Sequence, residues 1–169
     1  MVVKVKEPQP SEIAMLRDGQ VLFTYLHLAP DPEQTKDLIA SGATCIAYET
    51  VTDRRGHLPL LAPMSEVAGR MSIQAGAHCL EKSAGGRGVL LGGVPGVSPA
   101  RVTVVGGGVV GQNAVAMAIG MGAQVTVLDR DMEVLRNLDH LYGNRISTLF
   151  STVHTLEEAI IESDLVIGS

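Results

Sequence analysis

The sequence predicts an α/β protein in which helices alternate with the strands of parallel sheets. Two short β-branched runs, Arg101–Val105 and Gln124–Leu128, are typical of buried parallel strands. The segment between them, Val109–Met121, repeats apolar residues at helical spacing, and a G-x-G-x-x-G loop joins it to the first strand. This order opens a Rossmann-type doubly wound sheet. We expect that sheet to be incomplete and to be preceded by part of a smaller α/β domain.

The N-terminal segment begins with two expected strands. Val2–Lys6 alternates apolar and charged residues, and Val21–Leu26 is an apolar run. Between them, Ser11 is expected to cap a short helix. The strands leave Lys6 and His27 at their carboxyl ends, where ligand sites of α/β sheets collect. A single lysine is more often a solvated charge and a single histidine more often structural, so both readings stay open.

A second helix and a third strand follow. Asp31 is expected at the N-cap of this helix and Pro32 at its first position, where the N–H that proline lacks has no helical partner. Gly42 ends the helix, and Thr44–Tyr48 forms the strand, with Glu49 at its tip. This β-α-β alternation favours a parallel sheet.

A domain boundary is expected soon after this sheet. Asp53–Gly56 has the composition of a turn, and His57–Pro63 reads as a connection. We assign residues 1–59 to a partial substrate domain and residues 60–169 to a nucleotide-binding domain. Ser65 is expected to cap a long helix. The apolar stripe expected to face the core of this helix consists of Val67, Met71, Ala75 and Cys79.

The glycine loop predicts a dinucleotide site. Gly106 would make the tight turn, Gly108 would let the backbone approach a pyrophosphate, and Gly111 would let helix and strand pack closely. Asp129 stands at the end of the next strand, where the fingerprint places an acid that accepts hydrogen bonds from the ribose hydroxyls. A carboxylate there favours NAD over NADP, although Arg130 beside it could meet a 2′-phosphate.

Asp129 could instead simply cap the following helix, Met132–Tyr142. Asp131 is the other candidate for that N-cap. Arg145–Leu149 is expected to be the third strand of this domain. The next helix is expected to end at Glu162, and Thr155 with Glu158 is expected to form its capping box. Asp164–Ile167 is expected to be the fourth strand.

In a doubly wound sheet of order 3-2-1-4 the fourth strand lies on the far side of the first. Such a half-sheet would leave an open edge, so we expect an internal fragment of a longer protein that oligomerises or aggregates.

Composition excludes several classes of function. A net charge of −5 without a Lys/Arg cluster argues against nucleic acids and anionic membrane surfaces. No apolar run approaches the roughly 20 residues of a membrane span, and the N-terminus lacks a signal-peptide pattern. Cys45 and Cys79 lie far apart with no CxxC, so neither a disulfide framework nor a metal site is expected. We expect a soluble, cytoplasmic protein.

Five motifs in order, followed by the glycine loop, resemble the alanine dehydrogenase family over essentially the whole chain. The motifs are VKVKEP (Val3–Pro8), LFTYLHLA (Leu22–Ala29), IAYETV (Ile46–Val51), LLAPMSEVAGR (Leu60–Arg70) and GGRGVLLGGVPGV (Gly85–Val97). By this resemblance, Lys6 matches the substrate-binding lysine and His27 the catalytic histidine. The resemblance also implies that, besides the glycines, four residues contact the cofactor. These are Ser65, Asp129, Ser151 near the adenine, and Val109, a position where some members carry a hydroxyl.

The resemblance implies reversible oxidative deamination of L-alanine to pyruvate and ammonia, with NAD as hydride acceptor. His27 would move protons during water addition and ammonia release, and Lys6 would orient the substrate and polarise its carbonyl oxygen. Family members form homo-oligomers, typically hexamers. An arginine expected before Lys6 and an aspartate expected beyond Ser169 are absent, so we expect this chain alone to be inactive.

Two alternatives remain open. The NAD-binding subunit of proton-translocating transhydrogenases resembles the same family in fold and in its glycine loop, but YLHLA and PMSEVAGR favour the deaminating enzyme. The other alternative is an inactive fragment that binds NAD.

Overall fold

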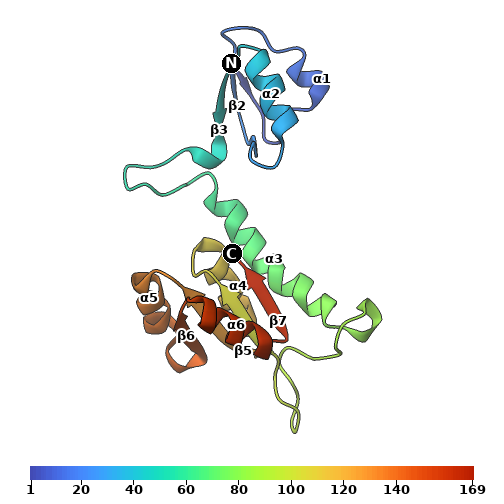
Figure 1. Cartoon of the computed structure of the whole chain (residues 1–169), viewed down its shortest axis with the longest axis vertical. Coiled ribbons are helices and arrows are strands. Elements are labelled where there is room, and N and C mark those ends of the chain that lie inside the picture. The colour runs from blue at the N-terminus through green and yellow to red at the C-terminus, as the bar shows by residue number, and fades with distance from the viewer. The chain divides into compact units, whose positions relative to one another are not determined.

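The computed structural model describes all residues from Met1 to Ser169 and divides them into two compact units, Met1–Pro63 and Met64–Ser169 (Figure 1). Each unit has its own parallel sheet and its own hydrophobic core. The mixed α/β class predicted from the sequence is confirmed.

The first unit contains a three-stranded sheet of order β1-β2-β3 with every pair parallel. Its elements are β1 (Val2–Val3), α1 (Pro10–Ile13), β2 (Val21–Thr24), α2 (Pro32–Ala40), β3 (Thr44–Ala47) and the 3-10 turn η1 (Tyr48–Thr50). The core of the unit joins one side chain from each helix to two from the second strand and the segment after it. These are Ile13, Leu38, Leu22 and Leu26. The predicted β-α-β alternation and parallel pairing are confirmed.

The expected strands of this unit are all longer than the observed ones. β1 ends at Val3, although Lys4 N–H still donates to Phe23 O at 3.2 Å and Tyr25 N–H to Val5 O at 3.2 Å. The pairing of β2 stops soon after Thr24, because the amides of Leu26 and His27 turn away from the sheet to a carboxylate described below.

Of the two helix caps predicted for the first unit, one is confirmed and one is wrong. Asp31 caps α2, and its carboxylate accepts a hydrogen bond from Gln34 N–H at 2.9 Å. Ser11 does not cap α1, because the helix begins one residue earlier, at Pro10, with Gln9 at the N-cap. Proline presets the backbone for the first helical position, so it defines where the helix begins.

The second unit contains a four-stranded parallel sheet of order β6-β5-β4-β7. Its strands are β4 (Arg101–Val105), β5 (Gln124–Asp129), β6 (Ile146–Phe150) and β7 (Leu165–Gly168). Its helices are α3 (Ala62–Cys79), which starts at the end of the first unit, α4 (Val109–Gly120), α5 (Met132–Tyr142) and α6 (Val153–Glu162), with 3-10 turns η2 (Lys82–Ala84) and η3 (Gly143–Arg145). The strand order is the doubly wound 3-2-1-4 predicted from the sequence.

The predicted inward face of α3 is wrong. The helix begins at Ala62, so Ser65 lies in its first turn and is not the cap. All four residues of the expected stripe are exposed, with Val67 at 57% and Met71 at 59%. The buried positions are instead Gly69, Ile73 and Gly76.

Two glycines explain which face of α3 packs inward. A Cβ added at Gly69 would lie 2.2 Å from the carbonyl oxygen of Val110 in α4. One added at Gly76 would lie 2.5 Å from the Leu165 side chain of β7. The helix therefore packs through its smallest residues, because these allow the backbones to approach most closely.

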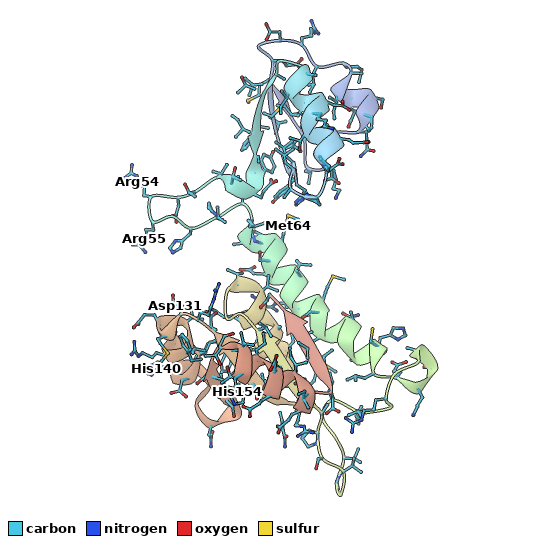
Figure 2. The ribbon with its side chains drawn as sticks, in the orientation of Figure 1. Arg54, Arg55, Met64, Asp131, His140 and His154 are labelled. Atoms are coloured by element: carbon cyan, nitrogen blue, oxygen red, sulfur yellow. The ribbon has the colours of Figure 1, made fainter.

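Two further caps were open or misassigned in the sequence. Asp131 caps α5, where it accepts Glu133 N–H at 2.8 Å, and it lies at the start of that helix in Figure 2. The cap of α6 is Thr152 and not the expected Thr155–Glu158 pair. Thr152 Oγ1 accepts Thr155 N–H at 3.1 Å, and Thr155 Oγ1 accepts Thr152 N–H at 2.9 Å. A second threonine thus takes the place that Glu usually holds in a capping box.

Candidate functional site

A groove lies at the carboxyl end of the second sheet, above the loop between β4 and α4. Its volume is about 470 Å³. It is lined by six of the seven positions predicted to contact a cofactor: Ser65, Gly106, Gly108, Val109, Asp129 and Ser151. These residues come from α3, the glycine loop, the first residue of α4, and the carboxyl ends of β5 and β6. The fold thus brings together side chains separated by up to 86 positions in the sequence, from 65 to 151.

The glycines of the loop are required by close contacts on one side and open space on the other. Gly106 has φ +102°, a backbone conformation that favours glycine. A Cβ on Gly111 would lie only 1.9 Å from Gly106 O, so this glycine supports the loop from below and does not line the groove. A Cβ on Gly108 would meet no atom within 4 Å, so the backbone there borders open space.

The first turn of α4 faces this open space with unpaired amides. Gly108 is the N-cap, and no side chain accepts a hydrogen bond from the amides of the first turn. Val109 and Val110 of that turn line the groove. Free N–H groups and the positive end of a helix dipole favour an anion, so the residues present fit the pyrophosphate of a dinucleotide.

Asp129 fixes the loop as well as lining the groove. One carboxylate oxygen accepts Gly107 N–H at 2.6 Å, and the other accepts Asp131 N–H at 2.8 Å. Burial raises the pKa of the Asp129 carboxyl, but the hydrogen bonds from the Asp131 and Gly107 amides outweigh burial and leave the pKa below its usual value. Arg130, the residue that could contact the 2′-phosphate of NADP, lines the same groove.

The first unit holds the other two predicted site residues at the carboxyl edge of its sheet. Lys6 is exposed and pairs with Glu7, with Nζ 3.3 Å from Oε1. The hydroxyl of the fully buried Thr24 donates to Val5 O and to Lys6 O, at 3.0 and 2.8 Å, and so holds the backbone that carries Lys6. His27 is half-buried.

His27 and Lys6 do not share a cavity. His27 lines a small cavity of about 260 Å³ with Glu7, Asp31 and Gln34, and Lys6 is not part of this lining. Glu7 carries one carboxylate oxygen, Oε2, that is buried without a hydrogen-bond partner.

Two acidic residues of the first unit were missed as site candidates. Glu7 directly follows Lys6, and Glu49 was seen only as the tip of a strand. Glu49 accepts hydrogen bonds from His27 N–H at 2.7 Å and Leu26 N–H at 3.1 Å. The available signal was position alone, since both residues follow parallel strands at the edge where sites collect.

Family models match both units. Residues 1–68 match the N-terminal domain and residues 72–169 the C-terminal domain described as alanine dehydrogenase/PNT. The chain belongs to the alanine dehydrogenase/PNT family. The resemblance inferred from the five sequence motifs is therefore confirmed.

Relatives within the family are similar over the whole chain. An alanine dehydrogenase of Halomonas elongata is 64% identical over 169 residues, which are 100% of this chain and 46% of that protein. A solved L-alanine dehydrogenase superposes with a TM-score of 0.84 at 53% identity, covering 96% of this chain and 45% of that one. The chain thus spans about half the length of the curated relatives it matches.

A solved transhydrogenase structure of lower sequence identity has a similar fold. The transhydrogenase from Sinorhizobium meliloti gives a TM-score of 0.74 at 23% identity, covering 99% of this chain and 48% of that one.

Two further observations bear on what this family member holds. No cluster of three or more His, Cys, Asp or Glu side chains could bind a metal ion. None of its helices has both the length and the apolar character needed to cross a membrane.

Proposed function

We propose that this chain carries the cofactor groove and part of the substrate site of an NAD-dependent alanine dehydrogenase. The groove that gathers Ser65, the glycine loop, Asp129 and Ser151 is the observation that carries the proposal. In a chain 64% identical to an alanine dehydrogenase, a groove lined by the expected cofactor residues supports the same chemistry. Residues 1–59 would then be part of the substrate domain and residues 60–169 part of the NAD-binding domain.

The groove favours NAD over NADP. Asp129 is an ionised carboxylate at the position expected for the ribose, and it would accept hydrogen bonds from both ribose hydroxyls. A 2′-phosphate would bring a second negative charge beside it, which costs free energy at short range. Arg130 could offset part of that cost, so the affinities for NAD and NADP must both be measured to decide between them.

The proposed reaction is L-alanine, NAD and water to pyruvate, ammonia and NADH. NAD, when bound, accepts the hydride from the α-carbon. The amino nitrogen loses a proton as the C–N bond becomes an imine, water adds to the imine carbon, and the C–N bond then breaks to release ammonia.

Lys6 and His27 would act on the substrate in this sequence. The Lys6 ammonium would bind and polarise the substrate oxygen, and because its side chain is exposed, a substrate oxygen could take the place of Glu7 as its partner. The His27 imidazole would take a proton from the attacking water and return one to the departing nitrogen. The base role needs a neutral imidazole, so deamination should decline at acid pH.

The test is NADH formation at 340 nm with L-alanine and NAD, run beside calorimetric titration of NAD and NADP. Alanine-dependent NADH formation that is lost in His27→Ala supports the enzyme. Binding of NAD without turnover supports the alternative of an inactive NAD-binding fragment. Failure to bind either dinucleotide contradicts the assignment of the groove.

Alanine-dependent NADH formation would exclude the transhydrogenase alternative, because a transhydrogenase subunit would bind NAD without oxidising L-alanine. Binding without turnover does not separate that subunit from the inactive fragment. A homo-oligomer, typically a hexamer in the family, is proposed for the active enzyme, and sedimentation velocity measures it directly.

A further inference from the structure

His27 has an unusual backbone conformation. Its φ is +48°, and it is the only residue other than glycine with a positive φ. A side chain on Cβ makes this left-handed region unfavourable by roughly 1–2 kcal/mol. Such a conformation persists only where neighbouring groups hold it.

The Glu49 carboxylate supplies the holding contacts. Oε1 accepts His27 N–H at 2.7 Å and Leu26 N–H at 3.1 Å, and Oε2 lies 3.3 Å from the same Leu26 nitrogen. On the other side of Leu26, the buried Gln34 side chain donates to its carbonyl oxygen at 2.6 Å. The backbone of Leu26 and His27 is therefore held by one side chain from the 3-10 turn η1, which follows β3, and by another from α2.

The same 3-10 turn also supports the aromatic wall beside the imidazole. The His27 ring stacks on Tyr25 with centroids 5.9 Å apart and an interplanar angle of 8°. Tyr25 in turn meets Tyr48 edge to face at 4.9 Å. Tyr48 is the residue next to Glu49, so one turn, Tyr48–Thr50, contacts both the backbone and the ring neighbour of His27.

Glu49 is suited to this task because it stays ionised. Burial raises the pKa of its carboxyl. Hydrogen bonds from the His27, Glu49 and Leu26 amides, together with the His27 charge, lower the pKa by more than burial raises it, so it lies below the usual value. An ionised acceptor makes stronger hydrogen bonds to amides than a neutral one.

We propose that Glu49 is a positioning residue for His27: its carboxylate holds the Leu26 and His27 amides and thereby fixes the turn that presents the imidazole to its cavity. The importance of this for catalysis rests on the proposed function, in which His27 moves protons. The positioning itself does not depend on that function and can be measured separately.

The experiment measures amide hydrogen exchange by NMR in the full 169-residue chain and in three variants. Glu49→Asp keeps the charge but withdraws the acceptor by one methylene, and Glu49→Gln keeps an acceptor oxygen at the same reach. Asp37→Asn, an exposed carboxylate on α2, is the control for loss of a charge in the same unit.

In Glu49→Asp, the Leu26 and His27 amides should exchange about tenfold faster, the change that loss of about 1.4 kcal/mol of hydrogen bonding produces. Glu49→Gln should stay within about threefold of wild type, since a neutral acceptor binds amides more weakly. Asp37→Asn should leave both rates unchanged. Wild-type rates in Glu49→Asp would overturn the proposal, as would equal acceleration of these two amides in the control.

An activity measurement separates this proposal from the proposed function. In an active preparation, Glu49→Asp should lower kcat about tenfold, leave KM for NAD unchanged, and have no further effect in a His27→Ala background, because residues that act as a unit are not additive. An equal further loss in that background would contradict positioning through His27. If the wild-type chain forms no alanine-dependent NADH, the enzymatic proposal fails, while the exchange rates still decide the role of Glu49.

Discussion

Substituting Gly111 by Ala tests the packing that supports the glycine loop. The new Cβ would lie 1.9 Å from Gly106 O and 2.9 Å from Ser169 Oγ, whereas ordinary contacts begin near 3.4 Å. The backbone carbonyl cannot rotate aside, so α4 must withdraw by about 1.5 Å, the difference between these two distances. Overpacking of this kind costs about 1–3 kcal/mol, while alanine gains about 1 kcal/mol of helix propensity. The contact is close enough for the upper end of the overpacking range, about 3 kcal/mol, and subtracting the propensity gain leaves a net destabilisation of about 2 kcal/mol.

Gly120→Ala is the matched control, because it lies on the same helix and its Cβ would meet nothing within 4 Å. It should leave stability unchanged or raise it by up to about 1 kcal/mol. Urea unfolding followed by far-UV circular dichroism compares the two variants, and calorimetry should show NAD binding weakened at least about tenfold in Gly111→Ala alone. Equal stability of the two variants would refute the argument from close packing.

Three other outcomes follow from carboxylates of both units and from the packing of the second. Asp129→Ala should weaken NAD binding about 30-fold, the equivalent of about 2 kcal/mol for hydrogen bonds to a charged acceptor. Asp131→Ala should instead lower the free energy of unfolding by about 1 kcal/mol and leave NAD affinity unchanged. Calorimetry measures the affinities, and urea unfolding measures the stabilities. The lowered pKa values of the Asp129 and Glu49 carboxyls mean that their stabilising effect is complete above the ordinary carboxyl range and is lost as the pH falls through the lower, folded-state values. Acid unfolding should therefore begin at higher pH in Asp129→Ala than in wild type. Near neutral pH the two proteins should differ in their free energy of unfolding but not in how it changes with pH. Gly69→Ala should destabilise the chain by about 1–3 kcal/mol, since its Cβ would lie 2.2 Å from a backbone oxygen, and stability equal to that of Gly120→Ala would contradict this.

The sequence was most informative where local pattern and fold agree. β4 runs from Arg101 to Val105 as expected, because a β-branched run bounded by a glycine loop has no competing interpretation. The Asp31 and Asp131 caps follow from side chains that bond amides two or three residues away. The strand order followed from the general rule for doubly wound sheets. Local sequence patterns together with one general topology rule thus sufficed for these features.

The sequence was least informative where contacts are distant or where small residues decide packing. The inward face of α3 was missed because the pattern sought bulky apolar residues, whereas Gly69 and Gly76 are buried for what they lack. Glu49 was missed as a partner of His27 because the two are 22 positions apart and meet only after β2 and β3 pair. A carboxylate that binds backbone amides at such a distance leaves no local signature.

The close contact of α3 with α4 links the packing of the second unit to its groove. Ser65 and Gly69 are one turn apart on α3, and helical residues four apart lie on the same face. Gly69 lies against Val110 O in the first turn of α4, and Arg70 Nε donates to Asn113 Oδ1 at 3.0 Å one turn further along. Since these two contacts fix α3 to the beginning of α4, they also fix where Ser65 lies beside the free amides of that helix. The residues that place this serine in the groove are therefore a glycine and an arginine that do not line it.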